Sequence, residues 1–311
     1  MESISSVSIT ILTATYNRAH LLPRLYQSIS LQTYDVEKID WLIIDDGSDD
    51  ETTTLIESFM LSANQPITYI KIAHGGKHRA LNEGFKHAKG DWVFIVDSDD
   101  WLKPSGLNFV QSAVEQAQNM GASIVQMPLV VPKAKKQYFF NKPDCVLSFA
   151  QRFVQEPEFD HSIIFSSAMM RYQFPEFEGE LFIAESALIY QMLNENIYIC
   201  NDAAVFAEYQ PNGLSANMLR NRMQSSLGSC HVYQQQLKAN LSARAYSRSL
   251  ANFGRFWWHS ILRGEKACTP KSLPQCLVIS LSWPFALFDI YNCLRYGYHP
   301  YGVSRCQSDY L

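Results

Sequence analysis

The sequence contains no uninterrupted apolar run of the ~18–20 residues that a membrane-spanning helix needs. The nearest approach, residues 272–288, is uncharged but contains Pro274 and Pro284. The N-terminal residues lack the basic start and the apolar stretch of a secretory signal peptide. From these absences we expect a cytoplasmic chain.

Paired cysteines and a phosphate-binding glycine loop are absent as well. The seven cysteines are odd in number and show no CxxC spacing, which argues against a disulfide framework or a zinc knuckle. The GxxxxGK(S/T) pattern of P-loop proteins does not occur. The glycine-rich signature of sugar nucleotidyltransferases is also missing after the first apolar segment. A reducing compartment fits this use of cysteine.

Acidic residues are scarce in the last third of the chain, although the whole sequence has a formal net charge of -4. Residues 1–210 hold 15 basic and 27 acidic side chains, whereas residues 211–311 hold 11 basic and 3 acidic ones. A sequence pI of about 6.1 gives no reason to expect a nucleic-acid partner. We therefore predict a catalytic domain over residues 1–212 and a basic, aromatic-rich helical region over residues 213–311.

Short apolar segments alternate with amphipathic ones through the first half of the chain. The apolar pattern predicts strands over residues 7–13, 41–45, 67–73, 91–96 and 122–128, and later over 162–170 and 197–209. Helices are predicted over residues 78–89 and 184–193, and the capping-box pattern of Ser48 and Glu51 predicts a helix start at Ser48. The alternation predicts an α/β fold, a mainly parallel sheet with helices on both faces. Beyond residue 211, apolar residues at helical spacing from Val232 to Ile261 predict one or two amphipathic helices.

Two aspartates follow the fourth predicted strand, at the edge where parallel sheets bind their ligands. Asp97 and Asp99 belong to the sequence Val-Asp-Ser-Asp-Asp at residues 96–100. Side chains alternate along an extended backbone, so both carboxylates are expected to point the same way. Such a pair suits a hard divalent cation whose remaining positions are filled by phosphate and water. The alternative is a solvated acidic turn that caps the next helix.

Polar residues follow the other three strands of this series too. Asp46 can accept a hydrogen bond from a base N–H, or it can serve an Asx turn. Tyr16, beside Thr15, can stack on a base or lie half-buried in a polar loop. Lys77, which follows two glycines, can meet phosphate or belong to a flexible basic loop. Each structural alternative is possible by itself, but four polar clusters in order at one sheet edge favour nucleotide binding over four independent structural roles.

These clusters carry a resemblance to a known family. The segments ITILTATYNR, LIIDDGSDDE, GGKHRALNEGFKHAKGDWVFIVDSDDWL and FPEFEGELFIAES together resemble family 2 glycosyltransferases of the GT-A fold, over about residues 7–210. The resemblance implies a Rossmann-like nucleotide-sugar domain. It also implies a set of site residues: Thr15, Tyr16 and Asp46 for the nucleoside, Lys77 for the base or diphosphate, and Asp97 and Asp99 for Mn²⁺ or Mg²⁺.

The family places its general base on a later acidic residue at a helix start. Here the corresponding stretch is residues 183–186, so Glu185 is the implied base. Ser186 stands where a second acidic residue is common, and Glu178 and Glu180 are alternative carboxylates. The competing interpretation of Glu185 is an acidic residue favoured by the helix dipole in a first turn.

The resemblance further implies an inverting, metal-dependent, hexosyltransferase-like enzyme. It would move a sugar from a nucleoside-diphosphate donor, expected to be UDP-linked, to a saccharide or lipid-linked hydroxyl in surface polysaccharide assembly. A catalytically silent nucleotide-sugar-binding or scaffold protein is the alternative. The presence of Asp97, Asp99 and Glu185 favours the enzyme.

The C-terminal region has a pattern of its own. Between residues 220 and 271, many basic side chains stand against Glu265 alone. They are interleaved with Phe256, Trp257 and Trp258 and precede the uncharged residues 272–288. This combination predicts peripheral contact with an anionic membrane, on its cytoplasmic face. Packing against the acidic domain and a homodimer contact are the alternatives, and no nucleic-acid partner is expected.

Overall fold

The computed structural model divides the chain into two compact units. The described residues are 7–33, 35–156, 160–211, 213–214, 216–239, 242–295 and 300–301. The first unit combines Met1–Phe174 with Gln191–Pro211, and the second combines Pro175–Tyr190 with Asn212–Leu311. The second unit thus includes Glu185, which the sequence-based division assigns to the catalytic domain.

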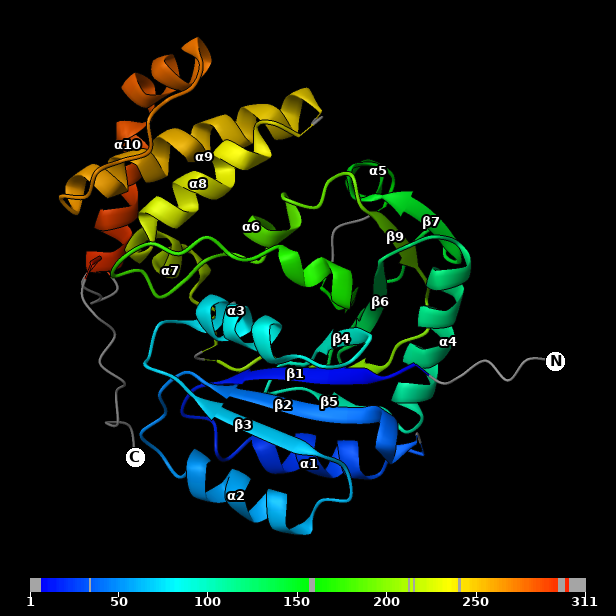
Figure 1. Ribbon diagram of the computed structural model, residues 1–311. Coiled ribbons are helices and arrows are strands. Elements are labelled where there is room, and N and C mark those ends of the chain that lie inside the picture. The colour runs from blue at the N-terminus through cyan, green and yellow to red at the C-terminus, as the bar shows by residue number, and fades with distance from the viewer. Residues whose placement is uncertain are drawn as a thin grey trace. The chain divides into compact units, whose positions relative to one another are not determined.

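A ten-stranded sheet forms the centre of the described part of the first unit (Figure 1). Its strands are β1 (Ile9–Thr15), β2 (Ile39–Asp45), β3 (Ile67–Lys71), β4 (Trp92–Ile95), β5 (Trp101–Leu102), β6 (Ile124–Val130), β7 (Cys145–Ser148), β8 (His161–Ser166), β9 (Asn196–Ile199) and β10 (Val205–Phe206). The main path is β3-β2-β1-β4-β8-β6-β10-β5, with β9 paired to β6 and β7 to β9. Strands β1 to β4 pair in parallel, whereas β8 is antiparallel to β4 and β6. The predicted mainly parallel α/β sheet is confirmed.

The strand register brings the predicted polar clusters to one edge. Thr15, the last residue of β1, is aligned with Asp45 at the end of β2. Asp45 is aligned in turn with Lys71 at the end of β3. On the other side of β1, Ile95 of β4 is aligned with Leu12. The loops that follow these four strands therefore start next to one another.

Helices cover both faces of this sheet. On one face, α1 (Leu22–Ser30), α2 (Thr52–Ser62) and α4 (Gly106–Asn119) place apolar residues in the main core with Ile9 and Ile11. On the other, α3 (Lys77–His87) packs on β1 and β2, as Figure 1 shows for α3 opposite α1 and α2. Gly84 allows the close contact of α3, because a Cβ there would lie 2.3 Å from Leu12 Cδ1.

The start of α2 differs from the prediction. The helix begins at Thr52 rather than at Ser48, and Glu51 makes no capping hydrogen bond through its side chain. Ser48 Oγ instead accepts the backbone N–H of Asn17 at 2.9 Å, which ties the β2 loop to the β1 loop. Asp50 Oδ1 accepts the Thr52 N–H at 3.0 Å and so takes over the helix start. A long-range hydrogen bond has replaced the predicted local one.

Shorter elements connect the rest of the sheet. Val36–Lys38 forms a 3-10 helix before β2, and β7 leads into α5 (Phe149–Gln155) through a capping box of Ser148 and Gln151. A second 3-10 helix, Ser167–Arg171, follows β8, so the predicted strand over 162–170 ends early. The predicted helix over 184–193 is also too long, because α6 covers only Ser186–Ile189. Beyond it, the Leu193 carbonyl accepts the Ala150 N–H at 3.2 Å as the chain leads into β9.

The second unit is helical throughout its longer described elements. After α6 come α7 (Met218–Gln224), α8 (Ser226–Gln236), α9 (Ala243–Leu262) and α10 (Leu273–Arg295). Its core is formed by Met223, Cys230, Tyr233, Phe253 and Phe256. The one or two helices predicted from the spacing of Val232 to Ile261 are confirmed as α8 and α9, whereas α7 and α10 were not predicted.

The sequence pattern did not predict α10 because Pro274 and Pro284 interrupt its apolar segment. Pro274 lies in the first turn, where its lack of an N–H removes no helical hydrogen bond, and Pro284 lies inside the helix. Within the described residues, α10 is the one helix that is long and apolar enough, by length and composition, to cross a membrane. The expectation that no segment reaches this length is corrected.

Candidate active site

The residues after β4 form a tight turn. The Asp100 N–H donates to the Asp97 carbonyl oxygen at 3.0 Å, so the backbone is not extended there. Strand alternation, from which a common direction of Asp97 and Asp99 was predicted, does not apply to this segment. Instead, each of the two carboxylates forms an ion pair with a different basic side chain.

Lys77 and Arg18 neutralise the two carboxylates. Lys77 Nζ lies 2.7 Å from Asp97 Oδ1 and 2.8 Å from Oδ2. Arg18 Nη1 lies 3.0 Å from Asp99 Oδ2. Partial burial alone would raise the pKa of Asp97, but the attraction of Lys77 and then Arg18 holds that pKa below its ordinary value. At Asp99 burial outweighs the attraction of Arg18, and the pKa is raised.

Asp100 adds a third carboxyl group to the same turn. Burial, followed by the negative charges of Asp97 and Asp99, raises the pKa of Asp100 to about 8. Three carboxyl groups thus share the charges of Lys77 and Arg18. The turn favours further positive charge.

The donor set of this turn fits a divalent cation that binds together with a diphosphate. The described residues contain no group of three or more His, Cys, Asp or Glu side chains that could hold a metal ion. Asp97 and Asp99 would therefore supply only part of a coordination shell. Mg²⁺ and Mn²⁺ prefer oxygen ligands, and Mg²⁺ is usually held by one or two carboxylates together with phosphates and water. The Asp97 side chain is 40% exposed, which leaves this carboxylate accessible.

The end of β1 supplies a buried hydroxyl group and a stacked aromatic ring. Thr15 is 3% exposed, and no described residue hydrogen-bonds to its Oγ1. A buried hydroxyl without a protein partner is a place where a ligand atom can bind. The Tyr16 ring stacks on His74, with centroids 4.0 Å apart and an angle of 16° between the planes. These features agree with nucleoside-binding roles for Thr15 and Tyr16, which stay predictions.

Asp46 lies in the protein interior and organises the loop after β3. Its Oδ1 accepts the Gly75 N–H at 2.7 Å, and its Oδ2 accepts the Gly76 N–H at 2.8 Å. His74 Nδ1 lies 2.9 Å from Oδ2 of the same carboxylate. Gly47 permits this close approach of the two loops, because a Cβ there would lie 2.8 Å from His74 N. A direct contact of Asp46 with the nucleoside stays a prediction, since its side chain is 4% exposed.

Glu185 occupies the position immediately before α6, in the second unit, and is exposed. Its carbonyl oxygen accepts the Leu188 N–H at 3.0 Å, which starts the helix. The predicted place of Glu185 at a helix start is therefore confirmed. Its role as general base stays a prediction.

The two alternative carboxylates of this segment differ from each other. Glu180 is fully buried, and its oxygens accept the N–H groups of Leu227 at 2.6 Å and Gly228 at 2.8 Å, at the start of α8. Burial raises the pKa of Glu180 to about 7 in spite of these hydrogen bonds. Glu178 is exposed. Glu180 thus has a structural role, whereas Glu178 and Glu185 meet solvent.

A polar pocket of about 320 Å³ lies within the second unit. Its lining includes Ser186, Arg222, Tyr233, Gln236, Arg248 and Asn252. Arg222 Nη1 donates to the Tyr233 hydroxyl at 2.5 Å, which fixes one of the two guanidinium groups. Guanidinium and amide groups in one pocket suit an anionic or hydroxyl-rich ligand. The pocket directly follows Glu185 in the chain, through Ser186.

Several residues that organise the acidic turn are missing from the sequence-based prediction. Arg18 pairs with Asp99, and its place two residues after Tyr16 was the available signal. Arg24 Nη2 donates to the Asp99 carbonyl oxygen at 2.6 Å, and Nη1 donates to Glu208 Oε2 at 2.7 Å. Arg24 lies inside an amphipathic helix, where a charged residue is expected on the solvent-exposed side. The sequence therefore contained no indication that Arg24 contacts the acidic turn.

The parallel strands and the acidic turn after β4 define an α/β domain with a polar site at the carboxyl ends of its strands. The profile of the family described as "Glycosyl transferase family 2" matches residues 10–175. The chain belongs to glycosyl transferase family 2, which confirms the resemblance seen in its sequence.

Two bacterial relatives show the extent of the sequence similarity. "Glycosyltransferase GlyG" of Streptococcus pneumoniae serotype 4 is 32% identical over 117 residues, which cover 38% of this chain and 37% of that protein. "Poly(ribitol-phosphate) beta-N-acetylglucosaminyltransferase TarS" of Staphylococcus aureus is 24% identical over 107 residues, or 34% of this chain and 19% of TarS. The matched stretches thus span well under two thirds of these relatives.

Solved structures extend the likeness to most of the chain. Residues 1–349 of S. aureus TarS in complex with UDP-GlcNAc match with a TM-score of 0.58 and 18% identity, over 82% of this chain and 73% of that one. The mannosyltransferase PcManGT from Pyrobaculum calidifontis, in complex with GDP-Man and Mn²⁺, matches with a TM-score of 0.55 and 15% identity, over 94% and 84%. At these identities the likeness establishes the fold, and the predicted GT-A fold is confirmed.

Proposed function

We propose that this chain transfers a sugar from a nucleoside-diphosphate sugar to a hydroxyl group of a saccharide or lipid-linked acceptor, with inversion at the anomeric carbon. The match of residues 10–175 to the family is the observation that carries the proposal. A UDP-linked donor is supported by TarS, whose structure contains UDP-GlcNAc. A role in surface polysaccharide assembly is supported by the poly(ribitol-phosphate) in the name of TarS.

The first unit is proposed to hold the donor. Thr15 and Tyr16 bind the nucleoside, and Asp46 holds the loop after β3 in the shape that receives it. Lys77 donates to the diphosphate from the start of α3. A divalent cation held by Asp97 and Asp99 would supply neutralisation of the charge that develops on the leaving diphosphate.

The second unit is proposed to act on the acceptor. The Glu185 carboxylate takes the proton of the acceptor hydroxyl, and that oxygen forms a bond to the anomeric carbon. The bond from this carbon to the diphosphate oxygen breaks in the same step, and nucleoside diphosphate leaves. Attack from the side opposite the leaving group inverts the configuration. Arg222 and Arg248 are proposed to bind polar groups of the acceptor in the pocket that begins at Ser186.

Release of nucleoside diphosphate tests this function. The full chain is incubated with UDP-GlcNAc, UDP-glucose or GDP-mannose and a saccharide panel, with Mn²⁺ or with EDTA. We expect release from one donor with Mn²⁺ and its loss with EDTA. A chain that binds a donor without turnover under every condition would instead be the scaffold protein considered above.

Two substitutions separate the proposed roles. Asp99→Asn should abolish metal-dependent release while the fold is retained, because one of the two proposed ligands loses its charge. Glu185→Gln should retain donor binding and lose turnover, and Glu178→Gln, which tests the exposed alternative base of the same segment, should keep turnover. Full turnover in Asp99→Asn would refute the metal assignment, and full turnover in Glu185→Gln would move the base to another residue.

A further inference from the structure

Helix α10 buries three polar side chains and exposes most of its large apolar ones. Gln275, Ser282 and Asp289 are at most 5% exposed, and they recur every seven residues along one side of the helix. Nine large side chains of α10 are between 47% and 74% exposed: Leu273, Leu277, Leu281, Trp283, Phe285, Leu287, Phe288, Tyr291 and Leu294. A helix on a water-exposed surface has the opposite arrangement.

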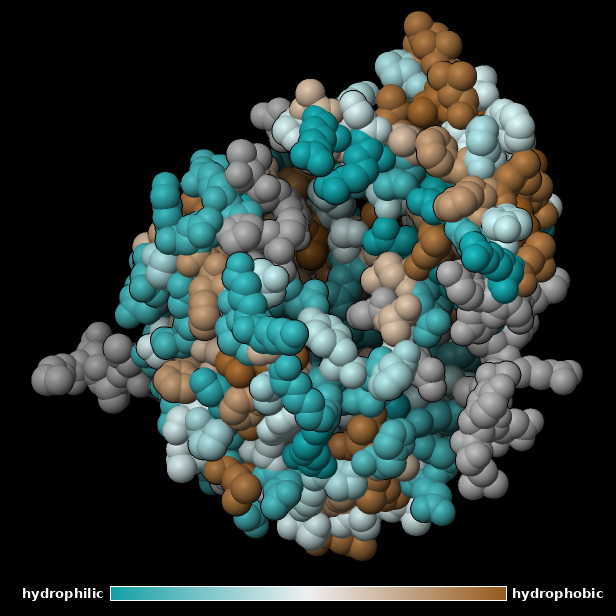
Figure 2. Space-filling view, turned by 180° about the vertical axis from the view of Figure 1, so that it is seen from behind, coloured by the Kyte–Doolittle hydropathy of each residue, from teal (hydrophilic) through white to brown (hydrophobic). Residues whose placement is uncertain are grey.

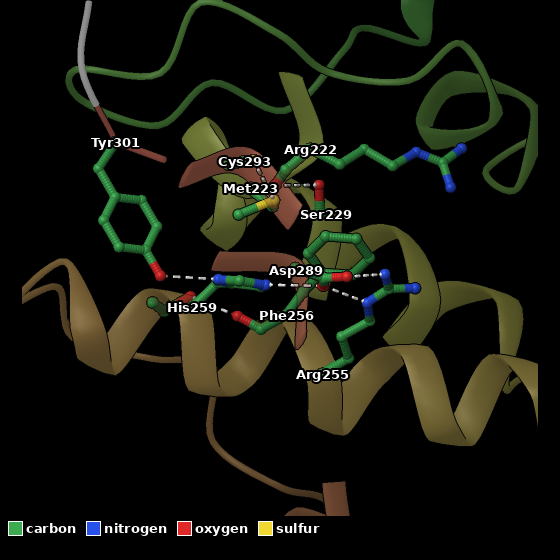
Figure 3. Close-up of polar contacts among 10 residues, drawn as sticks. Arg222, Met223, Ser229, Arg255, Phe256, His259, Asp289, Cys293 and Tyr301 are labelled. Carbon is green, nitrogen blue, oxygen red and sulfur yellow. Dashed lines mark hydrogen bonds and ion pairs between the residues drawn. The ribbon is translucent and has the colours of Figure 1, made fainter. Parts of the chain in front are cut away.

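The polar side of α10 is fixed against α9. Arg255 of α9 holds Asp289 through both carboxylate oxygens, and His259 Nε2 lies 3.1 Å from Asp289 Oδ2 (Figure 3). His259 Nδ1 is hydrogen-bonded to the Tyr301 hydroxyl at 2.8 Å. These contacts neutralise the one acidic residue of α10. They also prevent the helix from rotating its apolar side inward.

Close packing supports the same orientation further along the two helices. A Cβ at Gly254 of α9 would lie 2.3 Å from Ser282 Oγ, so only glycine allows this approach. Trp258 Nε1 of α9 donates to the Ile279 carbonyl oxygen at 2.6 Å. Most of the large apolar side chains of α10 therefore face away from α9, whereas Val278, Ile279 and Ile290 pack on the core of the second unit. Figure 2 shows apolar side chains gathered on this part of the molecule, at the upper right.

The charge around this apolar face is positive. Residues 211–311 contain 11 basic and 3 acidic side chains. Arg263 Nε lies 2.6 Å from Glu265 Oε1, and Asp289 is paired as described. The third acidic residue, Asp309, lies outside the described residues. Exposed Lys266 and Lys271 precede α10, and exposed Arg295 ends it.

We propose that the exposed face of α10 docks on an anionic phospholipid membrane and lies in its interface. The apolar side chains would enter the boundary between headgroups and acyl chains, with Trp283 and Tyr291 as interfacial aromatic residues. Lysine and arginine at the ends of the helix would meet the anionic headgroups. This inference does not depend on the proposed transfer reaction.

Packing against α9 favours a helix that lies in the interface over one that crosses the bilayer. At 1.5 Å per residue, α10 is about 34 Å long, enough to cross the hydrocarbon core. An upright α10 would bring α9 with it, including Arg255 and Arg263, into the hydrocarbon, where charged groups are unfavourable. With α10 in the plane of the interface, α9 stays on the protein side of α10, and these arginines stay out of the hydrocarbon.

Flotation with vesicles tests the proposal on the full chain. The vesicles contain phosphatidylcholine alone or phosphatidylcholine with ~30% phosphatidylglycerol as the anionic lipid. We expect the wild type to float with the anionic vesicles, at least tenfold more than with the neutral ones, and less at high salt. The double variant Leu281→Glu/Phe288→Glu replaces two side chains that are 74% and 60% exposed, and it should lose this binding more than tenfold.

A matched control and a second measurement keep the outcomes distinct. Leu31→Glu/Leu61→Glu changes two exposed leucines of the first unit, 70% and 91% exposed, and should float like the wild type. Circular dichroism should show unchanged helix content in both double variants.

Equal flotation of the two double variants would overturn the proposal. So would a lipid-free wild-type dimer, detected by analytical ultracentrifugation, that Leu281→Glu/Phe288→Glu converts to a monomer. Flotation needs no turnover, so this test is independent of the donor assay.

Discussion

Ionisation of Glu180 is expected to lower the unfolding free energy of the second unit as the pH rises through about 7. This carboxyl group is 0% exposed, and burial raises its pKa from the ordinary 4.5 to about 7. The folded chain therefore holds the proton more tightly than the unfolded chain does. The resulting stability is complete below pH ~4.5 and is lost as the pH rises through ~7. Such a shift in pKa corresponds to about 3 kcal/mol of unfolding free energy.

Urea unfolding at pH 5 and pH 8, followed by far-UV circular dichroism, measures this effect. Glu180→Gln removes the ionisable group, so the wild type should lose roughly 2–3 kcal/mol more between the two pH values than the variant does. The substitution also replaces one carboxylate oxygen that accepts a backbone N–H by an amide NH2, and the comparison across pH cancels the constant cost of this change. Glu178→Gln, exposed in the same segment, should keep the wild-type pH dependence. If Glu180→Gln keeps it as well, burial of this carboxyl group does not set its pKa, and the reasoning is refuted.

Three further outcomes follow from the loops and the pocket. Asp46→Asn leaves one oxygen for two backbone N–H donors, so the donor KM should rise about tenfold while the acceptor KM is unchanged; equal changes in both would contradict this. Gly47→Ala places a Cβ 2.8 Å from His74 N at a φ of +80°, and urea unfolding should show a loss of roughly 1–3 kcal/mol. Arg248→Ala should raise the acceptor KM about fivefold at an unchanged donor KM, corresponding to roughly 1 kcal/mol of binding free energy. Arg244→Ala, one turn earlier in α9, is its control, and the same effect in both would remove the pocket from acceptor binding.

The first four strands were predictable because each is a short apolar segment followed by a polar cluster. Their observed bounds all lie within two residues of the predicted ones. Pairing beyond β4 was not predictable in the same way. The segment of β8 has a strand pattern, but nothing in its composition indicates that it inserts antiparallel between β4 and β6.

Two similar capping patterns show why local signals are insufficient. Ser48 and Glu51 have the spacing of a capping box, and so do Ser148 and Gln151. Only the second pair forms one, because Ser48 Oγ is engaged by the backbone of Asn17. The competing partner is 31 positions away in the sequence. Its approach depends on the parallel register of β1 and β2, which no local pattern contains.

Contacts with distant residues, rather than local patterns, also decide the environment of the acidic residues and of α10. Glu180 and Glu185 are five positions apart and chemically identical, yet one is buried at the start of α8 and the other is exposed before α6. In α10, the spacing of Gln275, Ser282 and Asp289 indicates that polar residues share a side, but periodicity alone does not tell whether that side faces water or protein. Arg255 in α9 decides the question, because an ion pair to Asp289 is possible only if the polar side faces inward. The segment of α10, which its prolines make resemble an interrupted loop in the sequence, therefore forms a helix with an apolar surface. Exposure of that surface to water is unfavourable.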